Sequence, residues 1–221
     1  MEVNVLERLP NPIILNKLMK IQAALNMILC RDEWLRYHSF VQDWAEGVSM
    51  AKIDNGAGDH LIMLFSPEGA ILKGFDHESG LSPHAQDEYK VWQGIYDDVP
   101  KDLLSLLDND AIEQDDVTFC IWRTSNDPKW HKGNVEIPEG ESDGSDFLLG
   151  CIFDTPEDFA EFAAGYFECS PSLDVVAQIY NNFSITDSPI TEEMIHILNP
   201  DCDAKEVLQE LELSGLRGSL H

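Results

Sequence analysis

The spacing of hydrophobic residues predicts a helix near the start of the chain. Between Pro12 and Leu29 (PIILNKLMKIQAALNMIL), apolar residues recur at steps of three and four, which is the repeat of one helix face. Asn11, immediately before Pro12, is a typical N-cap because its side chain can accept the first free backbone N–H groups. Additional apolar residues widen the stripe, so we expect this helix to be largely buried.

Between residues 35 and 75 the pattern changes to that of strands. LRYHSFVQDW (35–44) and GVSMAKID (47–54) mix β-branched or aromatic residues with polar ones, and Asn-Gly follows as a turn signal. LIMLF (61–65) and AILKGF (70–75) are apolar at successive positions and are joined by Ser-Pro-Glu-Gly. Continuously apolar strands are typically buried on both faces. We therefore predict an antiparallel meander of about three or four strands.

The middle of the chain combines helices, strands and one long polar stretch. Residues 82–95 and 100–107 predict two helices, whereas VTFCIWRT (117–124) and FLLGCIF (147–153) predict two neighbouring strands. Residues 125–146 between these two strands are rich in polar residues and glycine. We expect this polar stretch to be an exposed excursion outside the core.

The C-terminal part is mainly helical. A threonine, a proline and two acidic residues at 155–158 are a strong helix start. Thr191 and Asp203 each begin a shorter predicted helix, and residues 173–183 are ambiguous between strand and helix.

These elements predict an α+β fold, with an N-terminal helix, an antiparallel sheet of about five or six strands and C-terminal helices. A length of 221 residues fits one large domain. We therefore expect a single domain over residues 1–221, with residues 185–221 as an alternative helical appendage.

The net charge of the chain indicates which kinds of partner it can bind. The chain has 41 acidic and 14 basic residues, which give a formal net charge of −27. A field of this sign repels DNA, RNA and anionic membranes, and it favours a basic partner, bound metal cations or solubility alone. The chain contains neither a P-loop nor a GxGxxG pattern. We expect a basic protein partner, no nucleic acid, no membrane and no cofactor.

The cysteines and the first residues indicate the compartment. The cysteine residues form no CxxC pair, and MEVNVLERLPNP lacks the features of a secretory signal. No apolar run reaches the length of a membrane span. We expect a cytoplasmic protein with reduced thiols. The five cysteines are Cys30, Cys120, Cys151, Cys169 and Cys202.

Asp76, His77, Glu78 and Ser79 follow the last strand of the meander and are the first candidate site. Histidine beside carboxylates can act as a general base or a metal ligand. Neighbouring residues of an extended strand point to opposite faces, so these side chains converge only if the chain turns. The sequence HESG lacks the first glycine of the G-x-S-x-G nucleophile motif. The structural alternative is that the four residues cap the following helix.

Trp130 and His131 are the second candidate, because they lie between two lysines in the polar stretch. Tryptophan is common at binding hot spots. Either the segment is an exposed contact surface, which we favour, or the tryptophan folds back onto the core. We group Trp130 and His131 with Asp76 and Glu78 as candidate partner-binding residues, and we expect no metal site.

Two segments carry a family resemblance. At KGFDHESGLSP (73–83) and ITEEMIHILNPDCDAKEVLQEL (190–211), the chain resembles uncharacterised bacterial cytoplasmic proteins of the toxin-immunity type. The resemblance implies a protein that neutralises a toxin by binding it, and it transfers no functional residue. We therefore expect a non-enzymatic acidic binding protein, specifically an immunity or inhibitor-type protein with a basic partner. The alternative is a metal-assisted or general-base hydrolase using Asp76, His77 and Glu78.

Overall fold

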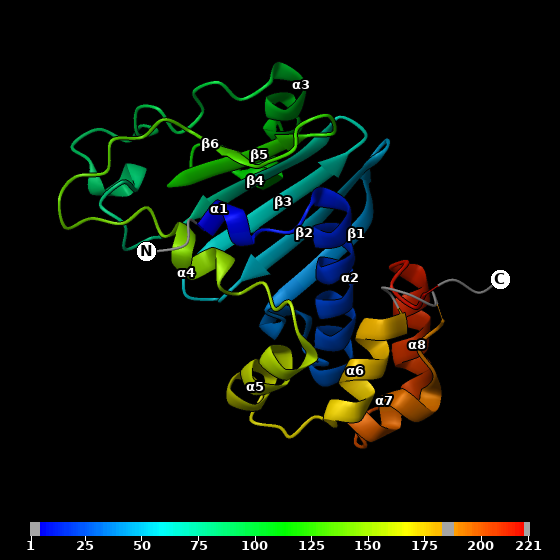
Figure 1. Ribbon diagram of the computed structural model, residues 1–221. Helices are drawn as coiled ribbons and strands as arrows, with labels where there is room; N and C mark the ends of the chain where they lie inside the picture. Colours follow the sequence, from blue (N-terminus) through cyan, green and yellow to red (C-terminus); the bar gives the residue numbers. More distant parts are fainter. Residues whose placement is uncertain (1–4, 183–187, 219–221) are drawn as a thin grey trace. The chain divides into compact units, whose positions relative to one another are not determined.

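The computed structural model describes residues 5–182 and 188–218 (Figure 1). The chain divides into two compact units, each described here by itself. The first unit contains Met1–Leu15 and Asp43–Cys151, and the second contains Asn16–Gln42 and Ile152–His221. The described residues 188–218 therefore belong to the second unit.

Both α-helices and β-strands are present, as the α+β prediction requires. In the described ranges, six strands form one antiparallel sheet in the order in which they occur along the chain (Figure 1). The strands are β1 (His38–Ala45), β2 (Val48–Asp54), β3 (His60–Ser66), β4 (Gly69–Phe75), β5 (Phe119–Thr124) and β6 (His131–Lys132). The α-helices are α1 (Val5–Arg8), α2 (Pro12–Leu29), α3 (Lys101–Leu104), α4 (Ser145–Leu149), α5 (Pro156–Tyr166), α6 (Leu173–Asn181), α7 (Glu192–Leu198) and α8 (Ala204–Leu213).

The strand prediction for the meander is confirmed, including the burial of its last two strands. All residues of β4 are buried, and β3 is buried except at its two ends. The two strands pair from His60 opposite Phe75 to Ser66 opposite Gly69. One face of this part of the sheet packs on hydrophobic residues from the connection between β4 and β5, which include Ile95, Leu103, Leu107, Ile112 and Val117.

The predicted helix over residues 82–95 is wrong. Only Pro83–Ala85 form a short 3-10 helix, η2, and the chain then remains irregular up to α3. Gly94 has a φ of +92°, and a Cβ at this position would lie 2.1 Å from the carbonyl oxygen of Asn134. This close backbone crossing requires a left-handed glycine, which an α-helix does not accommodate. Val91, Trp92 and Ile95 pack on the hydrophobic core from this irregular part of the chain.

The predicted strand over residues 147–153 is also wrong, because residues 145–149 form α4 instead. A short apolar run such as Phe-Leu-Leu fits a strand or one helical turn equally well. The preceding polar stretch is not an excursion outside the core either. It contributes the edge strand β6 and several buried residues, namely Trp130, Asp143 and Ser145.

The helix predictions in the rest of the chain are confirmed. α2 has the predicted bounds, and Asn11 Oδ1 accepts hydrogen bonds from two backbone N–H groups of its first turn. Side chains of Thr155, Thr191 and Asp203 cap α5, α7 and α8. The ambiguous segment forms the helix α6. Among the described residues, no helix combines the length and the hydrophobicity needed to cross a membrane.

A buried asparagine connects α2 to the start of β1 within the second unit. Asn26 Oδ1 accepts hydrogen bonds from the backbone N–H groups of Tyr37 (3.0 Å) and His38 (3.1 Å). Its Nδ2 donates to the carbonyl of Gln22 (2.8 Å) and to His38 Nδ1 (3.1 Å). The side chain is fully buried, so one amide holds the chain at the point where it enters the sheet.

A fully buried lysine lies in the first unit, in the middle of β4. Lys73 Nζ donates to the carbonyl oxygen of Ile112 (2.9 Å) and lies 3.1 Å from His60 Nε2. Burial lowers the pKa of Lys73 to about 8. Burial also lowers the pKa of His60 to about 4, with a further contribution from the Lys73 ammonium group. His60 is therefore neutral at pH 7 and can accept a hydrogen bond from Lys73.

We expect Asn26→Ala to destabilise the protein by about 2–4 kcal/mol, because two buried N–H donors lose their acceptor. The measurement is the free energy of unfolding in urea. Gln209→Ala, which removes an exposed amide from α8, is the control. A decrease in the free energy of unfolding no larger than that caused by Gln209→Ala would contradict the role of Asn26.

Lys73 makes stability depend on pH in the alkaline range. Its pKa is about 8 in the folded protein and 10.5 ordinarily, so between these values the unfolded chain binds more protons and stability rises with pH. We expect Lys73→Met to be at least as stable as the wild type at pH 7. Between pH 7.5 and 9.5, the wild type should gain on the order of 2 kcal/mol relative to this variant.

The difference in free energy of unfolding between wild type and Lys73→Met, measured at both pH values, tests this expectation. Lys90→Met removes an exposed lysine and changes the net charge equally, so it is the matched control. If the free energy of unfolding depended equally on pH in the two variants, the ionisation of Lys73 would not contribute to the pH dependence of stability.

Candidate functional site

The residues that follow β4 form a turn. The Ser79 N–H donates to the carbonyl oxygen of Asp76 (3.2 Å), and the Glu78 N–H donates to Asp76 Oδ1 (3.0 Å). An aspartate that accepts the N–H two residues later is a common turn device. The chain therefore makes the bend that convergence of these side chains requires.

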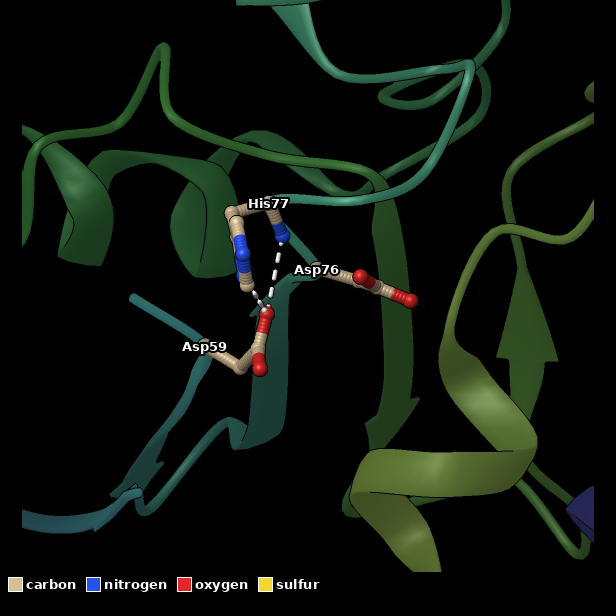
Figure 2. A group of neighbouring side chains, drawn as sticks. All are labelled: Asp59, Asp76 and His77. Atoms are coloured by element: carbon tan, nitrogen blue, oxygen red, sulfur yellow. Dashed lines mark hydrogen bonds and ion pairs between the residues drawn. The ribbon is translucent and has the colours of Figure 1, made fainter. Parts of the chain in front are cut away.

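His77 is paired with a carboxylate that the sequence reasoning missed, that of Asp59 (Figure 2). Asp59 Oδ1 accepts a hydrogen bond from the His77 backbone N–H (2.9 Å) and lies 2.7 Å from His77 Nδ1. Asn55 Nδ2 donates to the other oxygen, Oδ2, at 2.6 Å. Asp59 is only 6% exposed, whereas the His77 side chain is 44% exposed. The pair thus has a buried, anchored acid and an accessible imidazole.

The register of the β3–β4 hairpin explains this pairing. His60 lies opposite Phe75, so the residues just outside the paired strands, Asp59 and Asp76, come together at the same end of the hairpin. Extending the predicted pairing outward from the Ser-Pro-Glu-Gly turn would have indicated this neighbour.

Asp59, Asp76 and His77 form a compact group of potential ligands. One carboxylate oxygen from each aspartate and one imidazole nitrogen all lie within 4.8 Å of one another. Figure 2 shows Asp59 and His77 facing each other, with Asp76 beside them at the end of β4. Two glycines border the group: a Cβ on Gly58 would lie 3.3 Å from His77 Cγ, and one on Gly144 would lie 2.6 Å from Asp76 Oδ2.

The electrostatics of the pair favour opposite charges. The hydrogen bond from the His77 imidazole to the Asp59 carboxylate raises the pKa of His77 above its ordinary value of 6.5. Burial by itself raises the pKa of Asp59, but the hydrogen bonds from His77 and Asn55 outweigh it, so the pKa is lowered. A carboxylate that orients an exposed imidazole can serve a general base or a cation ligand.

The structure places the other two residues of the predicted tetrad differently. Ser79 is 5% exposed, its hydroxyl donates to the Ser142 carbonyl (2.6 Å), and it accepts from the Leu81 N–H (3.1 Å). Ser79 is therefore a structural residue of the turn, and its hydroxyl is engaged in hydrogen bonds on both sides. Glu78 is exposed and does not belong to the ligand group. The capping alternative is also wrong, because Ser82 caps η2.

The expectation that Trp130 is an exposed contact residue is wrong. Its side chain is 4% exposed, and its Nε1 donates to the carbonyl oxygen of Pro10 (2.8 Å). The pairing of β6 with β5 draws this segment onto the sheet edge, where His131 lies opposite Trp122. The two rings stack with centroids 6.0 Å apart. His131 is half-buried, so this segment supplies packing rather than a free aromatic surface.

A surface groove in the first unit was not predicted from the sequence. It has a volume of about 570 Å³, and its two walls come from the connection between β4 and β5 and from the segment after β6. Two carboxylates, an indole and an aliphatic side chain face it, and none of its lining residues is basic. The lining residues are Trp92, Gln93, Asp97, Asn134, Glu136, Ile137 and Pro138.

The backbones of the two groove walls cross closely at two glycines. A Cβ on Gly94 would lie 2.1 Å from the Asn134 carbonyl oxygen, and one on Gly133 would lie 2.1 Å from the Ile95 carbonyl oxygen. Larger residues at either position would force the walls apart. Gly94 and Gly133 were the available sequence signal, because isolated glycines often mark a close backbone approach.

Comparisons with protein-family models, curated proteins and solved structures gave no match.

We expect the raised pKa of His77 to depend on Asp59. A histidine whose folded pKa is raised stabilises the fold below its unfolded pKa of 6.5, and this stabilisation is lost as the pH rises through the folded value. In Asp59→Asn the titration midpoint of His77, followed by NMR, should fall towards or below 6.5. Asp87→Asn, which removes one exposed charge, should leave it unchanged. A midpoint that is the same in all three proteins would contradict the ion pair.

Proposed function

We propose that this chain is a non-enzymatic binding protein that holds a basic partner protein at the groove in its first unit. The observation that carries the proposal is the groove itself. Asp97 and Glu136 are exposed there beside Trp92 and Ile137, and no lining residue is basic. Following the resemblance of its sequence, we propose that it is an immunity or inhibitor-type protein of the cytoplasm.

The distribution of basic side chains supports a net attraction for a cationic partner. With a formal charge of −27, the acidic residues far outnumber the available cations, and several cations are already engaged within the protein. Lys73 is buried. Arg31 and Arg36 bind Glu210, Lys52 binds Asp54 and Lys132 binds Asp143. The uncompensated carboxylates give a negative field, which speeds the encounter with a basic protein.

The chemistry of the groove fits an arginine or lysine side chain of the partner. A guanidinium group can stack on an indole and bind a carboxylate in the same site. Trp92 is half-buried, with Asp97 and Glu136 exposed along the same groove. Ile137 is 44% exposed and can cover the aliphatic part of such a side chain.

The alternative, a hydrolase using Asp76, His77 and Glu78, has weaker support. His77 pairs with Asp59 rather than with Glu78, and the neighbouring hydroxyl of Ser79 is committed to the turn. A protein that only binds a partner does not need the imidazole of His77 or the hydroxyl of Ser79 as a reacting group.

Affinity capture of the tagged protein from a lysate of its native cell tests the proposal at about 50 mM and about 500 mM salt. We expect one stoichiometric basic protein at low salt and its release at high salt. The double variant Asp97→Asn/Glu136→Gln should bind that protein at least about tenfold more weakly, because it removes both groove carboxylates.

The matched control is Asp87→Asn/Glu88→Gln, which makes the same two chemical changes at exposed positions outside the groove lining. It changes the net charge equally and should retain most of the affinity. Equal weakening of the two double variants would show that the groove is not the contact site. The absence of any stoichiometric basic partner would overturn the proposed function.

A further inference from the structure

The group formed by Asp59, Asp76 and His77 has a property that the proposed binding function does not use. Its three residues lie at the same end of one hairpin, and two carboxylate oxygens and one imidazole nitrogen lie within 4.8 Å of one another. From this geometry we infer that the group is a binding site for one divalent transition-metal ion, with Zn²⁺ as the ion that fits it best.

The types of ligand decide which ion fits. Imidazole nitrogen together with carboxylate oxygen suits Zn²⁺ and its neighbours, whereas Mg²⁺ and Ca²⁺ favour oxygen ligands alone. Three protein ligands leave one tetrahedral position of Zn²⁺ for water or for a group of another molecule. Within the described residues, the ion pair that involves Asp59 is the one with His77, and neither Asp59 nor Asp76 pairs with a lysine or arginine.

Asp59 is held as a ligand by the residues around it. Its carboxylate is buried and is fixed by Asn55 and by the backbone N–H of His77. Such outer hydrogen bonds orient a metal ligand before the ion arrives. Asp76 is fixed in a similar way, because its Oδ1 accepts the Glu78 N–H and its Oδ2 lies beside Gly144.

Only a small closure is needed to bring the three ligand atoms around one ion. They now lie within 4.8 Å of one another, and ligands bound to Zn²⁺ at about 2.0–2.2 Å lie roughly 3 to 3.6 Å apart. His77 is the exposed member and can rotate towards the ion. Coordination replaces the hydrogen bond between His77 Nδ1 and Asp59 Oδ1, and the proton of that bond passes to solvent.

Calorimetric titration of the metal-free full-length protein with ZnCl₂ tests the site. We expect one Zn²⁺ ion per chain at this group, and binding weakened at least about tenfold in His77→Ala and in Asp76→Asn. His84→Ala is the matched control, because His84 is also exposed and bonds an aspartate, Asp116, at 2.8 Å. It should leave this binding unchanged. MgCl₂ should bind far more weakly than ZnCl₂.

A second measurement separates this site from the free thiols. Cys151, Cys169 and Cys202 are partly accessible, and a Co²⁺ ion bound by cysteine shows an intense thiolate charge-transfer band in the near ultraviolet. We expect Co²⁺ to bind without this band and to compete with Zn²⁺. Far-ultraviolet circular dichroism of each variant checks that it is folded. Asp76→Asn also preserves the size of the side chain in the turn.

Three results would overturn the inference: no binding of Zn²⁺, binding that survives both His77→Ala and Asp76→Asn in folded protein, or a Co²⁺ spectrum of thiolate ligation. All of these measurements use the isolated protein. The capture experiment can therefore fail to find a basic partner while the titration shows Zn²⁺ binding. Likewise, a partner can be found in the absence of Zn²⁺ binding.

Discussion

The register of the β3–β4 hairpin is the constraint on which most of the first unit depends. With His60 opposite Phe75 and Ser66 opposite Gly69, the central strands bury both of their faces. A shift by one residue would turn every buried side chain to the opposite face of the sheet. The same register brings Asp59 next to the turn that contains His77. The hydrophobic core and the candidate metal site are therefore two results of a single strand pairing.

The sequence predicts those parts of the fold that depend on local patterns. The helix from Pro12 to Leu29 and the four strands of the meander have strong periodicity and clear turn or cap residues, and the structure confirms them. The segment 82–95 does not form the predicted helix, because its conformation depends on the crossing of Gly94 with Asn134, which is distant in sequence. The short run after Ser145 contains too few residues to distinguish a strand from a helix.

The candidate sites were harder to predict for the same reason. The burial of Trp130 depends on an acceptor at Pro10, 120 residues earlier in the chain, and no local composition indicates that acceptor. The local sequence singles out His77 but not its partner, because Asp59 immediately precedes β3 on the other side of the hairpin. Pairing the strands explicitly, rather than inspecting neighbouring residues, would have found the pair.

The glycine crossing beneath the groove has a consequence for how this protein can change. The backbones of the two walls cross closely at Gly94 and Gly133, and this crossing involves no side chain that faces the groove. The exposed residues at positions 97, 136 and 137 can be exchanged while this crossing and the packing of Trp92 on the core keep their shape. A few substitutions could thus redirect recognition to a different partner, which separates the evolution of specificity from the maintenance of the fold.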